Sequence, residues 1–177
     1  MRERIEDITV IAWLKNYFDK KELKDKNLEP ILHFSLLWNL FEHTFPPEQK
    51  EPYNERLRYL AAEYHKYISE ETLNVIYSYF KKRYIIGNEI NVLFDKLLFK
   101  KKEYEECQKI LLSDNPHKED RLKCVLLIIY RFRNNLFHGN KNPKTLNLYS
   151  AQFKVINKFL MSYIEATAEK YGINRNN

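Results

Sequence analysis

One segment, residues 118–137, constrains the fold of this chain more than any other. Apolar side chains recur there in steps of three and four residues, at Leu122, Val125, Ile129, Phe132 and Leu136. Because this spacing lines one face of an α-helix, we expect a helix whose apolar face packs in a core. Leu127 and Tyr130 lie off that face. A helix that is apolar on two sides is either central in its domain or also buried against a second chain.

The rest of the chain reads as further helices separated by short breaks. Its 177 residues include three glycines and six prolines, fewer turn-forming residues than a sandwich or barrel needs. Apolar spacing predicts further helices over about 5–18, 33–42, 53–67, 70–83, 90–112 and 148–171. Pro30 opens the second of these and Pro46-Pro47 ends it, Ser69 caps the fourth, and the fifth has an interruption near 100–102. Breaks are expected at Gly87-Asn88 and at 113–116. We therefore predict an all-α helical bundle formed by residues 1–177 as a single domain.

Charge is distributed unevenly along the chain. Residues 1–70 carry 11 Lys and Arg against 13 Asp and Glu, whereas residues 71–177 carry 19 against 11. A basic half favours a polyanionic partner, most plausibly nucleic acid, although such an excess of charge can also serve solubility alone.

Several classes of protein are not indicated by this sequence. Cys107 and Cys124 form no CxxC pair, which favours a reducing, cytoplasmic setting without a disulfide framework. The charged N-terminus has no signal-peptide core, and we expect no membrane partner. No HExxH, Walker, GxGxxG or GxSxG pattern occurs, so we expect no metal and no cofactor. The other histidines are read as structural or exposed; they are His33, His43, His65 and His117.

A polar cluster ends the helix predicted over 118–137. Residues 131–139 read RFRNNLFHG, which brings guanidinium, amide and imidazole groups together at the end of an apolar run. Arginine grips phosphate oxygens in a bidentate way, and histidine exchanges a proton near neutral pH. RNA carries its own nucleophile, the 2′-hydroxyl, so its cleavage needs proton transfers and a cation that stabilises the phosphorane. The alternative is a structural helix end, where Arg133 pairs with a carboxylate and His138 suits the helix dipole.

The segment Arg133-Asn134-Asn135-Leu136-Phe137-His138 resembles the Arg-x4–6-His signature of the HEPN superfamily, with a polar residue directly after the arginine. Upstream, residues 36–42 (LLWNLFE) are similar to a Leu-Trp-x-x-Phe helix that precedes the signature in some members. One toxin subgroup has a tyrosine two positions after the histidine, where a partner nucleotidyltransferase modifies it. This chain has Asn140 there, so the resemblance does not extend to that mode of silencing.

The resemblance implies a HEPN-type bundle with extra helices, which forms a homodimer across the motif helix around a shared RNA-binding cleft. It implies that Arg133 and His138 are catalytic and that Asn134 is the supporting polar residue. The implied activity is metal-independent endoribonuclease cleavage that leaves 2′,3′-cyclic phosphate and 5′-hydroxyl ends. The implied setting is a toxin–antitoxin or antiphage system, with an antitoxin or regulatory protein as a further partner. The alternative is a catalytically inactive HEPN-like module that binds RNA or a partner protein.

Further residues near the motif are expected to contact RNA, namely Arg131, Asn135, Lys141 and Lys144. Two basic clusters with aromatic neighbours, 80–84 and 99–102, have a composition that can hold phosphates and stack bases, or that simply suits helix ends. Trp38 and Phe41 are expected in the core rather than as stacking platforms for bases.

Overall fold

The computed structural model describes residues 9–18, 25–45, 52–138, 146 and 148–168. Within these ranges the regular structure is helical apart from one short hairpin, which confirms the predicted all-α class. The helices are α1 (Val10–Phe18), α2 (Asp25–Thr44), α3 (Tyr53–Tyr64), α4 (Glu70–Tyr84), α5 (Val92–Asp95), α6 (Lys101–Leu112), α7 (Lys118–Phe137) and α8 (Ser150–Ala168). The antiparallel hairpin consists of β1 (Ile85–Ile86) and β2 (Glu89–Ile90). None of the described helices is long and apolar enough to cross a membrane.

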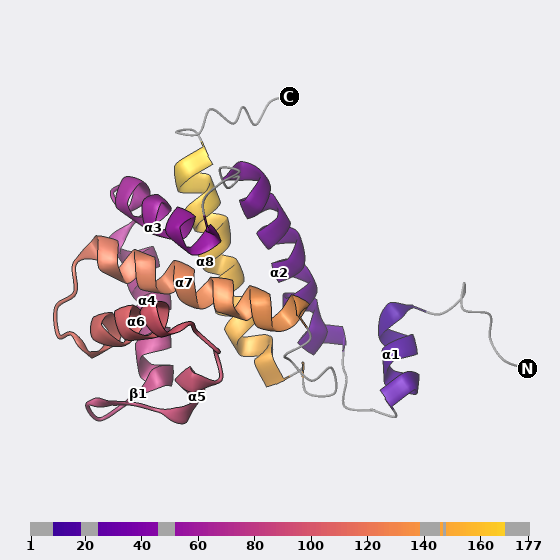
Figure 1. The fold of residues 1–177 in the computed structure, drawn as a ribbon. Helices are drawn as coiled ribbons and strands as arrows, with labels where there is room; N and C mark the ends of the chain where they lie inside the picture. The colour runs from indigo at the N-terminus through magenta and orange to yellow at the C-terminus, as the bar shows by residue number, and fades with distance from the viewer. Residues whose placement is uncertain (1–8, 19–24, 46–51, 139–145, 147, 169–177) are drawn as a thin grey trace, which may run out of the picture.

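Helix α7 is the central element of the bundle, and its predicted bounds are confirmed at both ends (Figure 1). It packs against α3, α4 and α6 of its own chain. Its middle is buried on all sides, at Leu122 and from Cys124 to Ile129. The apolar second side, including Leu127, is therefore explained by the central position of the helix, and it does not indicate a contact with a second chain.

Helix α2 packs along α8 and carries an aromatic core (Figure 1). Trp38 and Phe41 are 2% and 0% exposed, which confirms their predicted core position. The prediction that Pro30 opens this helix is wrong, because α2 begins five residues earlier, at Asp25. Leu28 extends the buried face to that early turn, so packing outweighs the one backbone hydrogen bond that proline cannot donate.

The segment between α4 and α6 departs most from the predicted helices. Gly87, with φ of +61°, forms the turn of the β1–β2 hairpin where only a break was expected. The helix predicted over 90–112 is wrong in its first part, since α5 has four residues and the chain is irregular over 96–100. Phe94, fully buried against the rings of α4 and α6, anchors this turn, so packing there overrides helix continuation.

Of the helix predicted over 5–18, α1 covers residues 10–18, and residues 5–8 lie outside the described residues; the remaining predicted helices are found with small shifts of their ends. Ser69 caps α4 as predicted, with its Oγ accepting from the Thr72 N–H at 3.0 Å. Helix α3 ends at Tyr64 rather than at residue 67, and α8 begins at Ser150 rather than at residue 148. The described part of α8 ends at Ala168.

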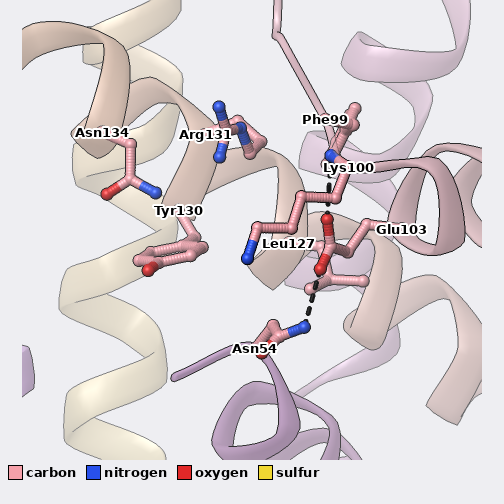
Figure 2. Close-up of a pocket in the computed structure, with 8 residues that line it drawn as sticks. All are labelled: Asn54, Phe99, Lys100, Glu103, Leu127, Tyr130, Arg131 and Asn134. Atoms are coloured by element: carbon pink, nitrogen blue, oxygen red, sulfur yellow. Dashed lines mark hydrogen bonds between the residues drawn. The ribbon is translucent and has the colours of Figure 1, made fainter. Parts of the chain in front are cut away.

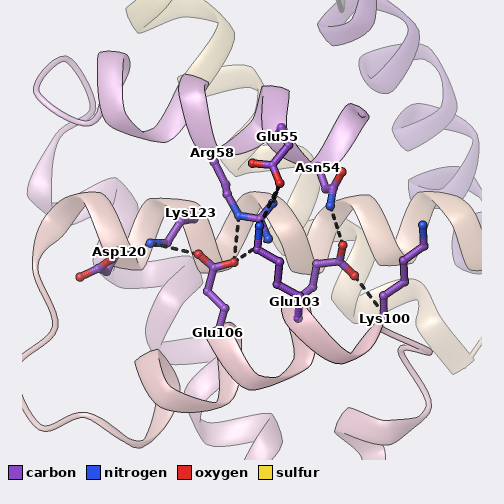
Figure 3. A network of polar contacts seen from close by, with 9 residues as sticks. Asn54, Glu55, Arg58, Lys100, Glu103, Glu106, Asp120 and Lys123 are labelled. Atoms are coloured by element: carbon purple, nitrogen blue, oxygen red, sulfur yellow. Dashed lines mark hydrogen bonds and ion pairs between the residues drawn. The ribbon is translucent and has the colours of Figure 1, made fainter. Parts of the chain in front are cut away.

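A network of ion pairs ties α3 to α6 and α7 (Figure 3). Arg58 on α3 donates through Nε and Nη2 to Glu106 Oε2 at 2.9 and 2.7 Å, and through Nη1 to Glu55 at 2.8 Å. Lys123 on α7 lies 3.2 Å from Glu106 and 2.8 Å from Asp120. These contacts hold the middle of α3 and the middle of α6 against α7, and the starts of α3 and α6 form one side of the candidate site.

Candidate functional site

Arg133, the first residue of the motif, connects α7 to α2. Its Nη2 donates to Glu42 Oε1 at 3.4 Å, and its Nη1 donates to the adjacent Asn134 Oδ1 at 3.3 Å. The guanidinium carbon also lies 5.4 Å from the centroid of the Phe137 ring. Both hydrogen bonds are long for charge-assisted contacts, and 27% of the arginine side chain is exposed. Arg133 is therefore oriented by neighbours on two helices while part of its surface is open to a ligand.

A groove of about 270 Å³ lies beside this pair, lined by Ser35, Trp38, Asn39, Glu42, Arg133 and Phe137. Tyr53, at the start of α3, adjoins it, with its ring tilted against that of Trp38 and the two ring centroids 5.9 Å apart. Burial raises the pKa of the Tyr53 hydroxyl, the charge of Glu42 raises it further, and Arg133 acts in the opposite direction. This hydroxyl is buried without a partner among the described residues, and it stays a protonated donor close to the ion pair.

His138, the last residue of the motif, is exposed and caps the C-terminal end of α7. Its backbone N–H donates to the Asn134 carbonyl at 2.9 Å, so helical geometry reaches this residue. Leu127, Arg131, Asn134 and His138 follow one another at intervals of four, three and four residues, which places them on one stripe of the helix. We call these four residues the motif stripe. Arg133 lies outside it and is joined to it by the hydrogen bond to Asn134.

Arg131 and Asn135 meet at one backbone carbonyl in the irregular segment before α6. The Nε of Arg131 donates to Leu97 O at 2.9 Å, and the Nδ2 of Asn135 donates to the same oxygen at 3.1 Å. Asn135 is 1% exposed and its amide holds residues 96–97 against α7, so its predicted RNA contact stays a prediction beside this structural role. Arg131 is partly exposed, and its two terminal nitrogens have no hydrogen-bond partner in the described part of the chain.

A second cavity, of about 110 Å³, lies along the motif stripe (Figure 2). We call it the stripe pocket; its lining residues are Asn54, Phe99, Lys100, Glu103, Leu127, Tyr130, Arg131 and Asn134. Glu103 Oε1 accepts from Asn54 Nδ2 at 2.6 Å, and its Oε2 accepts from the Lys100 backbone N–H at 3.0 Å. The side chain of Lys100 extends toward Tyr130 in Figure 2, and its ammonium has no ion pair with a described residue.

The sequence also singled out two lysines after the motif and two cysteines. Lys141 and Lys144 are outside the described residues, and their predicted RNA contacts stay predictions. Cys107 and Cys124 are free and buried, and burial raises the pKa of the Cys107 thiol. Over the described ranges, no three His, Cys, Asp or Glu side chains are grouped so that they could hold a metal ion.

Reasoning from the sequence missed three residues that adjoin the motif. Glu42 belongs to the upstream segment quoted for its resemblance, and a carboxylate in an otherwise uncharged segment was the available signal. Tyr53 and Asn54 follow a predicted helix start, and nothing in the sequence connects them to α7. Comparisons with protein-family models, with curated proteins and with solved structures find no match to this chain. The HEPN resemblance therefore depends on the motif residues themselves.

Proposed function

We propose that this protein is a metal-independent endoribonuclease of the HEPN type, in which Arg133, Asn134 and His138 act on the scissile phosphate. The observation that carries the proposal is the exposed His138 at the end of a stripe that also holds Asn134 and Arg131. An imidazole open to solvent can exchange protons with RNA, and the nearby guanidinium groups can face phosphate oxygens. A toxin or antiphage role, with an antitoxin or regulatory protein as partner, belongs to the same proposal.

The proposed reaction uses the 2′-hydroxyl of RNA as nucleophile. A base takes the proton of this hydroxyl, its oxygen bonds to phosphorus, and the bond from phosphorus to the 5′-oxygen breaks. An acid gives a proton to that leaving oxygen, which yields a 2′,3′-cyclic phosphate and a 5′-hydroxyl end. Histidine can serve in either role, and such a group typically contributes about 10²–10⁴-fold to the rate. Arg133 would stabilise the added charge on the phosphorane oxygens.

A homodimer would bring two copies of His138 to one cleft, one for each proton transfer. The apolar middle of α7 is already covered within the chain, so any dimer contact must use another surface. A row of exposed leucines on α2, Leu32, Leu36 and Leu40, offers one, because it adjoins the helix face that carries Glu42. Leu36→Glu is expected to convert a dimer to monomers in sedimentation analysis, and an unchanged mass would exclude this face.

One observation favours a second candidate function, a module that binds RNA or a protein without cleaving it. The Arg133 guanidinium already shares a hydrogen bond with Glu42, as a structural arginine would. In that case Arg133 would orient the end of α7, and the exposed cations would supply the whole of the binding surface.

The two candidates are separated by incubating the protein with mixed tRNA and mRNA in EDTA and mapping the new ends. Arg133→Ala and His138→Ala are tested in parallel, with His117→Ala as the matched control because His117 is an exposed histidine at the opposite end of α7. We expect the wild type and the control to cleave, and both motif variants to lose about 10²-fold or more of the rate. Ends with a 5′-phosphate, or cleavage that His138→Ala leaves intact, would refute the proposed mechanism.

A further inference from the structure

The stripe pocket gathers positive and donor groups around a small space. Lys100 brings an ammonium from the start of α6, and Arg131 brings the two terminal nitrogens that have no partner in the described part of the chain (Figure 2). At about 110 Å³ the pocket is far smaller than the roughly 300–1,000 Å³ of sites that enclose whole small molecules. Its size suits a group of a few atoms rather than a base with its sugar.

The charges of the pocket are unbalanced toward the positive. Its one carboxylate, Glu103, is 6% exposed and is engaged by the Asn54 amide and by the Lys100 backbone N–H. Neither Lys100 nor Arg131 forms an ion pair with a described residue; burial lowers the pKa of the Arg131 guanidinium, and the charge of Glu103 acts in the opposite direction. Lys100 is exposed, whereas Arg131 is partly buried, and a partly buried cation without a hydrogen-bonded carboxylate is costly unless an anion meets it.

Asn134 connects the pocket to the catalytic motif. Asn134 is 7% exposed and lines the pocket; its Oδ1 accepts from Arg133, and its Nδ2 has no partner among the described residues. In Figure 2 this nitrogen points to the side of Tyr130, while the oxygen points away. An amide donor that lines a pocket and has no acceptor within the described residues can donate to a ligand atom or a water.

We infer that the stripe pocket is an anion subsite, in which Lys100, Arg131 and Asn134 Nδ2 bind the phosphate of an RNA nucleotide next to the one that is cleaved. Its role in cleavage rests on the proposed function, whereas the anion site itself rests on the geometry. His138 is the next residue of the motif stripe, one turn or about 6 Å of helix rise beyond Asn134. A strand held in the pocket by one phosphate would therefore present a neighbouring linkage to the imidazole.

The subsite is tested first with inorganic phosphate as the probe. Nitrogen-15 NMR follows the Asn134 side-chain amide and the Arg131 Nε–H during a phosphate titration of the full chain. Lys100→Gln is compared with Lys101→Gln, the same change at a neighbouring lysine whose side chain is 89% exposed and outside the pocket. We expect both signals to shift, and Lys100→Gln to raise the Kd for phosphate about tenfold while Lys101→Gln changes it less than about twofold. Unmoved signals, or equal effects of the two variants, would overturn the anion site.

The link to RNA is tested with a single-stranded 2′-O-methyl oligonucleotide, which lacks the nucleophilic hydroxyl and stays uncut. Its affinity is measured by fluorescence anisotropy over a range of KCl concentrations. We expect Lys100→Gln to flatten the salt dependence by about 0.7, the slope of one phosphate contact, and Lys101→Gln to leave it unchanged. If inorganic phosphate binds but the salt dependence of oligonucleotide affinity has the same slope in both variants, the pocket does not bind an RNA phosphate. Cleavage of natural RNA by the wild type is measured separately. If the pocket binds phosphate and the oligonucleotide but the protein cleaves no RNA, only the proposed nuclease activity is refuted.

Discussion

Two polar clusters flank the junction of α3, α6 and α7, and they differ in how their cations are paired. In the network of Figure 3, Arg58 is held by Glu106 and Glu55, and Lys123 is held by Glu106 and Asp120. In the stripe pocket of Figure 2, Lys100 and Arg131 have no carboxylate partner among the described residues. Both clusters are built from the same helices, so the position in the fold does not by itself explain why only one of them has carboxylate partners for its cations.

The comparison shows which positive charges serve the fold and which are left for a ligand. A cation that meets two carboxylates has its burial offset within the chain, and removing it exposes unpaired anions. A cation that meets only a backbone carbonyl keeps an uncompensated charge, which attracts an anion from outside. Substitutions in the ion-pair network of Figure 3 should therefore change stability, and substitutions in the stripe pocket should change binding.

The largest expected effect is on stability, from Arg58→Ala. The side chain is 15% exposed and makes three hydrogen bonds to two carboxylates, so its loss should lower the free energy of unfolding by about 2–3 kcal/mol. Urea denaturation measures the change, with Lys101→Gln as a control expected to stay within about 0.5 kcal/mol. A loss as small as that of the control, or weaker oligonucleotide binding by the folded variant, would break the comparison.

Asn135→Ala tests whether this amide serves structure, as its burial indicates, or RNA, as the sequence suggested. Losing its hydrogen bond to Leu97 O should lower the free energy of unfolding by about 1–2 kcal/mol and leave the salt dependence of oligonucleotide binding unchanged. The exposed Asn115 supplies the control, Asn115→Ala. A variant of normal stability that binds RNA more weakly would restore the RNA contact.

Glu42→Gln probes the ion pair between Arg133 and Glu42. This pair is intermediate between the two clusters, because Arg133 has a carboxylate partner but remains partly exposed. The Arg133 side chain is 27% exposed, and Glu42→Gln removes the carboxylate charge beside its guanidinium. Oligonucleotide binding should tighten about two- to fivefold, because an RNA phosphate then no longer competes with Glu42 for Arg133. Glu29→Gln, on the same helix and paired with His33 at 3.8 Å, is the matched control in the anisotropy assay. Weaker binding together with slower cleavage would instead identify Glu42 as the residue that positions Arg133.

Helix α7 was predictable at both ends because its signals are local: a proline-containing turn precedes it, an apolar face runs through it and a polar cluster ends it. The contacts that define the site are not local. Arg133 meets Glu42 across 91 residues, Asn54 meets Glu103 across 49, and Arg131 meets Leu97 across 34. These pairs follow from how the helices pack, and no spacing rule within one helix contains them. The same limit applies to Asn135, since only packing shows that this amide is buried.

The smallest expected effect concerns Glu55, at the solvent edge of the network. The hydrogen bond from Lys102, and after it the charge of Arg58, lowers the pKa of the Glu55 carboxyl below its ordinary value of 4.5, although burial acts in the opposite direction. A carboxyl whose pKa is lower in the folded chain adds stability above its unfolded pKa and loses that contribution as the pH falls through the folded value. Because 42% of this side chain is exposed, Glu55→Gln should lower the free energy of unfolding near neutral pH by less than about 0.5 kcal/mol. In urea titrations the difference from wild type should vanish in acid and in 1 M salt, whereas a difference that grew in acid would reverse the assigned sign.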